Sequence, residues 1–111
     1  MLVKRNQLLK VLTEWGPEYE IKLDVKINSW IGKWGSILRF TADPAEGNCC
    51  QVGQRIPSLW TQQGSRDTLH LATNINGHGN HFFEMGGFQA GIWYSFVISQ
   101  KEEEVIDYHF F

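Results

Sequence analysis

The fold class of this chain is decided by one stretch of sequence, Tyr19-Glu20-Ile21-Lys22-Leu23-Asp24-Val25-Lys26-Ile27-Asn28. Apolar and polar residues alternate through all five pairs, and a period of two is typical of a β-strand with one buried and one wet face. Helical spacing cannot bring these five apolar side chains to one side. Pro17, just before the stretch, also blocks a helix from continuing into it. The stretch therefore predicts an amphipathic strand over residues 19–28.

Six further runs predict strands at short intervals along the chain. They are separated by breaks rich in Gly, Asn and Asp, which form turns. One such break is Asn76–Asn80, where Asn76-Gly77 is a dipeptide favoured in hairpins. Many short strands with such turns predict an all-β fold, an antiparallel two-sheet sandwich of the jelly-roll type. The six runs are Ser36–Thr41, Ile56–Thr61, Thr68–Ile75, His81–Met85, Ile92–Gln100 and Val105–Phe111.

The two ends of the chain leave alternatives open. Residues 1–15 form either a helix over Gln7–Trp15 or a strand, and the strand is favoured because a sandwich has little use for one short helix at its edge. The last four residues, Tyr108-His109-Phe110-Phe111, continue a strand pattern. An exposed apolar edge invites strand pairing. We expect a single domain over residues 1–111 that either lacks a further C-terminal strand or packs there against a second copy.

Composition narrows the class of protein. The chain has 111 residues, 42% of them hydrophobic, which suits one domain with its own core. Ten Lys and Arg residues against 12 Asp and Glu residues give a net charge of −2. That balance argues against a nucleic-acid-binding protein, which normally carries a basic patch. No apolar run is long enough to span a membrane, and the N-terminus lacks the continuous apolar stretch of a secretory signal.

Tryptophan is the most informative residue type for function. Five tryptophans are many for this length. An exposed aromatic ring stacks well on a sugar face or on the apolar surface of a partner, because it offers a large rigid area. Trp34 lies in a predicted turn, and Trp60 follows Leu59 in a predicted strand, so one of those two neighbours faces outward. Trp93 lies in an apolar run and is predicted to be in the core.

Polar side chains near one predicted turn suit a sugar ligand. Amide and imidazole groups both donate and accept hydrogen bonds, as sugar hydroxyls require. Turn stabilisation is the alternative role of the asparagines. Arg55 adds a charged donor, or else anchors a loop by pairing with Asp43 or Glu46. The predicted ligand-binding residues are Trp34, Arg55, Trp60, Asn74, Asn76, His78 and Asn80.

Catalytic motifs do not support an enzyme. The sequence has no Gly-x-Ser-x-Gly, no Walker loop and no dinucleotide fingerprint. A glycosidase needs two carboxylates that face one cleft. The candidates Glu104 and Asp107 would point to opposite faces of a strand. We expect no catalytic residues.

Metal and cysteine patterns are also weak. His78 and His81 are three residues apart and could share a metal, and the oxygen-rich loop 43–48 could hold calcium, but solvated turns are the favoured interpretation of both. We expect no metal and no cofactor. Cys49 and Cys50 are adjacent, which disfavours a bond between them. They are expected to be reduced thiols or to pair with cysteines elsewhere, and a strained disulfide between the two is the least favoured alternative.

Five segments carry a family resemblance: Gly16–Leu23, Ile37–Thr41, Gly53–Trp60, Leu69–Gly77 and Trp93–Gln100. Together they resemble the concanavalin A-like lectin and glucanase domains, and among these most closely the laminin-G-like modules of extracellular animal proteins. The resemblance covers residues 16–111 and implies a jelly roll and an extracellular location. The Glu-x-Asp-x-x-Glu arrangement of the family's glucanases is absent, so hydrolysis is not implied.

These observations predict a non-catalytic binding module that recognises a glycan or an extracellular protein through a loop surface. The alternative is a self-assembly module that forms a homodimer through edge strands. A glycoside hydrolase is the third and least favoured hypothesis. No nucleic acid and no membrane insertion are expected.

Overall fold

A computed structural model of the chain describes residues 10, 12, 15, 16, 18–42, 54–75, 78–101 and 105–110, and for residues 75, 78, 79 and 105–110 it describes the backbone only. Within these residues the chain forms seven strands and no helix, which confirms the all-β prediction. The strands are β1 (Tyr19–Lys26), β2 (Gly35–Arg39), β3 (Ser58–Thr61), β4 (Leu69–Ile75), β5 (His78–Met85), β6 (Trp93–Lys101) and β7 (Val105–Phe110).

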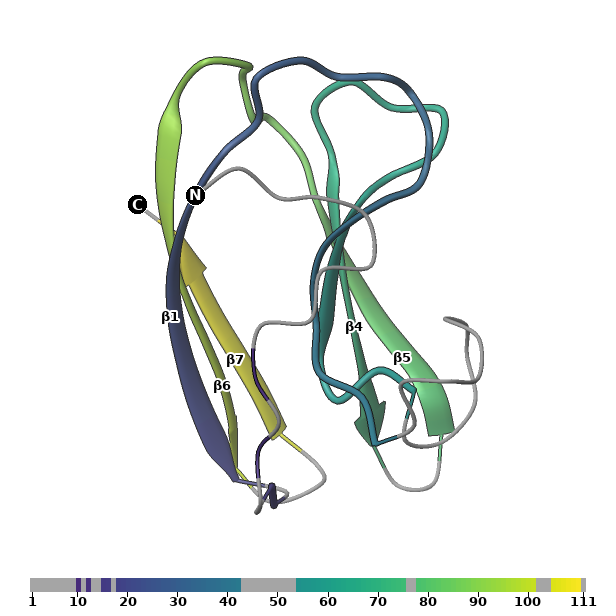
Figure 1. Ribbon diagram of the computed structural model, residues 1–111, viewed down its shortest axis with the longest axis vertical. Coiled ribbons are helices and arrows are strands. Elements are labelled where there is room, and N and C mark those ends of the chain that lie inside the picture. The colour runs from purple at the N-terminus through teal and green to yellow at the C-terminus, as the bar shows by residue number, and fades with distance from the viewer. Residues whose placement is uncertain are drawn as a thin grey trace.

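The strands form two antiparallel sheets. One has three strands in the order β1-β6-β7, and the other has four in the order β2-β3-β4-β5. Every paired neighbour runs antiparallel. Figure 1 shows the sheets as two layers that face each other. The predicted antiparallel two-sheet sandwich is therefore confirmed, while the jelly-roll connectivity stays a prediction.

The core lies between the two sheets and follows from the alternation along each strand. In β1, Val25 is buried, and Ile21 and Leu23 pack against the core from the same face. The outward residues of that strand are charged, so one face meets the other sheet and one meets water. Burial of this apolar surface is the main stabilising contribution to the fold. The buried core residues are Val25, Leu59, Leu69, Leu71, Met85, Phe88, Phe96 and Ile98.

Most strand boundaries differ from the predictions by one to three residues, as in β1, β3 and β5. β1 ends at Lys26, before Ile27, whose carbonyl accepts a hydrogen bond from the Gly91 amide instead of continuing the ladder. β3 begins at Ser58, because Pro57 has no amide proton to donate. β5 begins at His78, three residues earlier than predicted, so the ladder with β4 extends to Ile75 and His78. The turn predicted over residues 76–80 is correspondingly shorter.

The prediction that Trp93 belongs to the core is wrong. Its side chain is 61% exposed. The register pairs it with Lys26, whose neighbour Val25 faces the core, so Lys26 and Trp93 face outward together. The Lys26 ammonium lies 5.3 Å from the centroid of the Trp93 ring, as in a cation–π pair.

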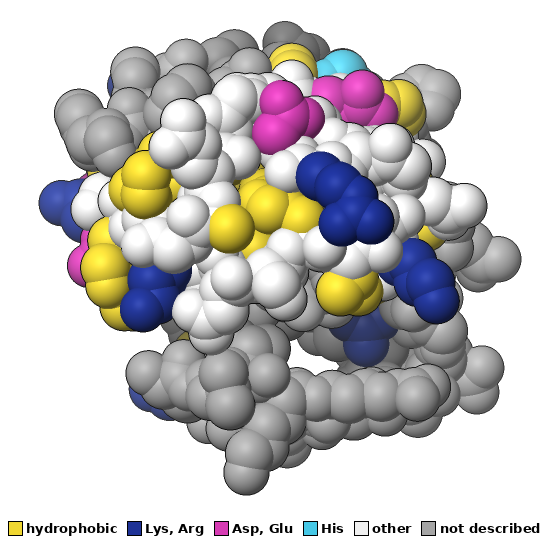
Figure 2. Space-filling model, turned by 90° about the horizontal axis from the view of Figure 1, so that it is seen from above, with side chains coloured by type: hydrophobic (Ala, Val, Ile, Leu, Met, Phe, Trp, Pro, Cys, Tyr) yellow, Lys and Arg dark blue, Asp and Glu magenta, His cyan; other side chains and the backbone are white. Residues whose placement is uncertain are grey.

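Backbone hydrogen bonds tie together three connections at one end of the sandwich. The Gly91 amide donates to Ile27, the Gly64 amide to Gly32 and the Phe88 amide to Asp67, at 2.8, 3.0 and 3.0 Å. These bonds link segments 27–34, 62–68 and 86–92. Figure 2 looks onto this end and shows hydrophobic side chains near the middle of the face, with acidic and basic side chains beside them.

Several predictions fall outside the described residues. They concern the thiols Cys49 and Cys50, the oxygen-rich loop 43–48, Glu104 and most of the helix or strand predicted within residues 1–15. Of residues 1–15 only Lys10, Leu12 and Trp15 are described, and none of these three lies in a helix or a strand. The side chain of Asp107 is likewise not described. None of the described residues forms a helix that could cross a membrane.

Candidate functional site

The candidate site lies on the outer face of the four-stranded sheet. Leu59 and Leu71 point into the core, so Trp60 and His70 beside them point the other way. The register places Trp60 opposite His70, and His70 opposite Glu84. Two residues from connections join them: Trp34, just before β2, and Arg55, before β3. The outer-face cluster is defined here as Trp34, Arg55, Trp60, His70, Asn80, Phe82 and Glu84.

Two exposed aromatic rings are held in place by a buried histidine. The His70 ring stacks on Phe82 with centroids 4.7 Å apart, and the edge of Trp34 meets it at 4.9 Å and 82°. His70 is 4% exposed, whereas Trp34 is 43% and Phe82 48% exposed. Stacked and edge-to-face contacts at these separations are favourable. The two exposed rings therefore sit on either side of a rigid support.

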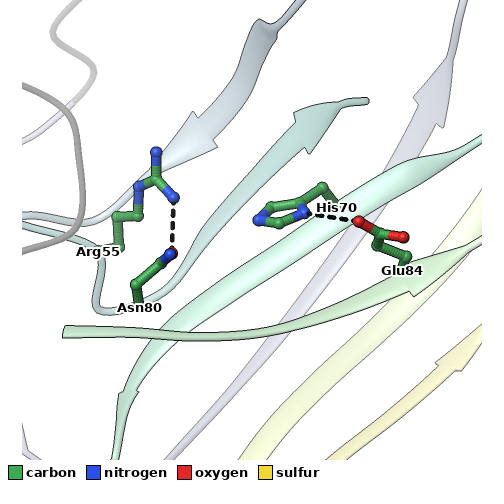
Figure 3. A network of polar contacts seen from close by, with 4 residues as sticks. All are labelled: Arg55, His70, Asn80 and Glu84. Carbon is green, nitrogen blue, oxygen red and sulfur yellow. Dashed lines mark hydrogen bonds and ion pairs between the residues drawn. The ribbon is translucent and has the colours of Figure 1, made fainter. Parts of the chain in front are cut away.

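Arg55 lies over Trp60 on the same face and reaches Asn80. Its guanidinium carbon lies 4.9 Å from the centroid of the Trp60 ring, and its Nη1 donates to Asn80 Oδ1 at 2.9 Å (Figure 3). The indole N–H of Trp60 donates in turn to Ser58 Oγ at 2.7 Å. The Arg55 side chain therefore connects the segment before β3 with β5, which lies two strands away in the sheet.

The surroundings of His70 favour its neutral form. Burial lowers the pKa of His70, and the positive charge of Arg55 lowers it further, while Glu84 acts in the opposite direction. His70 Nδ1 lies 3.8 Å from Glu84 Oε1, which is beyond hydrogen-bonding distance (Figure 3). That nitrogen has no hydrogen-bond partner in the described part of the chain. Burial and the nearby charge of Arg39 also lower the pKa of Arg55, but an arginine stays charged at neutral pH.

Four of the seven predicted ligand-binding residues come together in this cluster: Trp34, Arg55, Trp60 and Asn80. The prediction that either Leu59 or Trp60 faces outward is confirmed, and the outward residue is Trp60. Its side chain lies beneath Arg55, however, and is only 6% exposed. It is therefore not an open stacking surface. Arg55 contacts Asn80, while its suggested partners Asp43 and Glu46 lie outside the described residues.

The remaining three predicted residues do not join the cluster. Asn74 lines a pocket between the sheets, together with Trp15 and Tyr19. Asn76 lies outside the described residues, and only the backbone of His78 is described. Their roles stay predictions.

The sequence prediction missed His70, Phe82 and Glu84. The alternation Leu69-His70-Leu71 does point His70 outward, and this signal was available. It does not reveal that the two rings on either side would bury the imidazole. Phe82 and Glu84 depend on the register of the β4–β5 pair, which the sequence leaves open.

The chemistry that this cluster can perform is recognition by stacking, hydrogen bonding and charge. Glu84 is its one carboxylate, and the side chain is 48% exposed. Among the described residues, no three His, Cys, Asp or Glu side chains gather as a metal site would require. A glycosidase pair would need a second carboxylate within about 5–10 Å.

Comparisons with known proteins give no further identification. No family model, no curated protein and no solved structure matches the chain.

Proposed function

We propose that the chain is a non-catalytic binding module that holds a glycan on the outer-face cluster. The observation that carries this proposal is the pair of exposed rings, Trp34 and Phe82, fixed on either side of buried His70. Aromatic rings stack on the C–H faces of sugars, and a ring that is already immobilised loses little entropy when a ligand binds.

Polar groups around the rings support the same ligand class. The exposed carboxylate of Glu84 accepts hydrogen bonds from sugar hydroxyls. Arg55 and Asn80 offer a donor and an acceptor close to the rings and already held together. Most of this surface comes from strands, whereas the sequence pattern suggested loops. The extracellular location implied by the family resemblance belongs to the same proposal.

Substitution of the exposed rings tests this function. After a glycan-array screen, the affinity for the best glycan is measured by titration for the original chain and for Trp34→Ala and Phe82→Ala. Loss of a stacking ring is expected to weaken binding about tenfold. Trp93→Ala is the matched control, because this ring is also exposed but lies on the other sheet. An array without hits, or an equal loss in Trp93→Ala, would contradict the proposal.

Self-assembly through edge strands is the alternative function. Within the described residues, β1 and β7 are the edges of one sheet, and β2 and β5 of the other. Edge strands offer unpaired backbone groups to a second copy. A stable dimer in gel filtration, combined with no glycan binding, would favour this alternative.

An extracellular protein is the other ligand class, and it would dock on the same two exposed rings. If the chain binds such a protein and the glycan array gives no hits, the ligand of this surface is a protein and not a glycan.

A further inference from the structure

A second concave site lies between the two sheets, at the lower end of the sandwich in Figure 1. It is a pocket of about 220 Å³. The start of β1 and the end of β6 contribute Tyr19 and Gln100 from one sheet, and the end of β4 contributes Thr73 and Asn74 from the other. It is separate from the outer-face cluster and shares no residue with it.

One wall of this pocket is held rigidly by Trp15. Its indole N–H donates to the carbonyl of Ile56 at 2.6 Å. Its ring stacks on Tyr19 at 5.0 Å and on Phe40 at 4.7 Å. Next to it, Gly16 carries no side chain, and a Cβ built there would meet nothing within 4 Å. The pocket therefore has a fixed aromatic wall beside an open rim.

Neutral hydrogen-bonding groups line the rest of the pocket. The Tyr19 hydroxyl donates to Gln100 Oε1 at 2.9 Å, and the Thr73 hydroxyl donates to the same oxygen at 3.1 Å. The two hydroxyls also lie 3.2 Å apart and hydrogen-bond each other, so they share two protons among three contacts. Because a hydroxyl oxygen has two lone pairs, each oxygen keeps at least one that can accept a hydrogen bond from a ligand. Among the described residues, none of those that line the pocket carries a charge.

Asn74 adds a group without a partner. Its Oδ1 is buried and has no hydrogen-bond partner among the described residues. A buried amide oxygen without a donor is unfavourable. Asn74 is one of the residues that line the pocket. A ligand that offers an O–H or N–H group there would supply the partner that this oxygen lacks.

We propose that this pocket binds one small, uncharged, polyhydroxylated molecule of monosaccharide size. The described lining is uncharged, and it would leave the charge of a buried ion uncompensated, so it favours a neutral ligand. The volume exceeds the roughly 150 Å³ of a cavity that accepts benzene, so a six-membered ring fits. The acceptor oxygens of Tyr19 and Thr73 and the unpartnered oxygen of Asn74 match the hydroxyls of such a ring.

Titration of the whole chain with three probes, glucose, galactose and N-acetylglucosamine, tests this site by ¹H–¹⁵N NMR. At least one probe is expected to shift the Trp15 indole and the amides of Thr73, Asn74 and Gln100, with a dissociation constant of about 1 mM. Asn74→Ala is expected to weaken this binding about tenfold. Gly16→Leu fills the open rim and is expected to abolish it without removing a hydrogen-bonding side chain.

The controls separate this site from the proposed function. Trp34→Ala is expected to leave the shifts at the pocket unchanged, while it weakens glycan binding on the outer-face cluster. Shifts confined to Trp34 and Phe82, or no shifts with any of the three probes, would overturn the pocket proposal. If a variant does not fold, as judged from the dispersion of its own spectrum, the titration of the original chain still decides.

Discussion

His70 is the residue on which the outer-face cluster depends most. Its ring fills the space between Trp34 and Phe82, and its Nδ1 finds no partner in the described structure. Burial of an imidazole in this way favours its neutral form. Glu84 is close enough to attract a charged ring but not to bond the neutral one. Protonation of His70 at low pH is therefore expected to destabilise the packing of its ring between Trp34 and Phe82.

Substitution His70→Phe is expected to remove a pH dependence of stability. Because the pKa of His70 is lowered in the folded protein, the unfolded chain binds the proton more readily. The free energy of unfolding therefore falls as the pH drops below about 6.5, and it stops falling below the pKa of the folded state. Phenylalanine keeps the aromatic contacts without the titration. Urea unfolding at about pH 7.5 and about pH 5 measures the difference.

The matched control for this experiment is His81→Phe. His81 is on the neighbouring strand and exposed, so its substitution is expected to leave the acid-induced loss of stability in place. An equal loss in the His70→Phe variant and the original chain would show that His70 is not responsible.

At the scale of the elements, the alternation of residues was sufficient to predict where the strands lie but not which faces meet. The Asn76-Gly77 dipeptide is favoured in two-residue hairpins, which would pair Ile75 with His78, and the structure has this pair. Continued without interruption, that register would place His70 opposite Phe83. The structure has a register shift between Thr73 and Ile75, and His70 lies opposite Glu84 instead.

This one-residue shift reverses the faces of β5, because side chains alternate along a strand. It turns Phe82 and Glu84 outward and lets Phe83 lie on the other face. A shift of this kind depends on the packing of both sheets, so it cannot be predicted from the sequence of one hairpin. For that reason the sequence could predict Trp34, Arg55 and Asn80 as candidates but not Phe82 and Glu84, whose side of the sheet depends on this shift.

The substitution Gly35→Ala tests how closely β2 packs against its neighbour β3, where Gly35 is paired with Thr61. A Cβ at this position would lie 2.8 Å from Thr61 Oγ1, which is held by a hydrogen bond to the Lys33 carbonyl at 2.9 Å. Thr61 must therefore move and lose that bond, at an expected cost of about 1–3 kcal/mol in the free energy of unfolding.

A double-mutant cycle with Thr61→Ala checks this explanation. In the Thr61→Ala background the clash is gone, so Gly35→Ala is expected to cost at least about 0.5 kcal/mol less than it does alone. Denaturant unfolding of the four proteins gives the interaction energy. Strictly additive effects would show that the Gly35–Thr61 contact does not limit this position.

At the scale of the whole molecule, the two ends of the sandwich differ in how they are held. The end seen in Figure 2 is tied by backbone hydrogen bonds between its three connections, and an Arg66 side chain that donates to the Trp30 carbonyl adds to them. At the other end, side chains join the sheets through Tyr19, Thr73 and Gln100. The sequence predicted Gly-rich turns, but bonds between turns far apart in the chain follow only from the packed sandwich.

Hydrogen exchange measures how rigid the tied end is. The amides of Gly64, Phe88 and Gly91 are expected to exchange at least about tenfold more slowly than the Ile31 amide, allowing for intrinsic rates. Ile31 is the matched reference, since it lies in one of the same connections, is 61% exposed and has no backbone hydrogen bond in the described part of the chain. Gly91→Ala should remove the protection at residue 91, because a φ of 79° strains any residue with a Cβ. If all four amides exchange at the same rate, the connections open independently, and the bonds between them do not make this end of the molecule rigid.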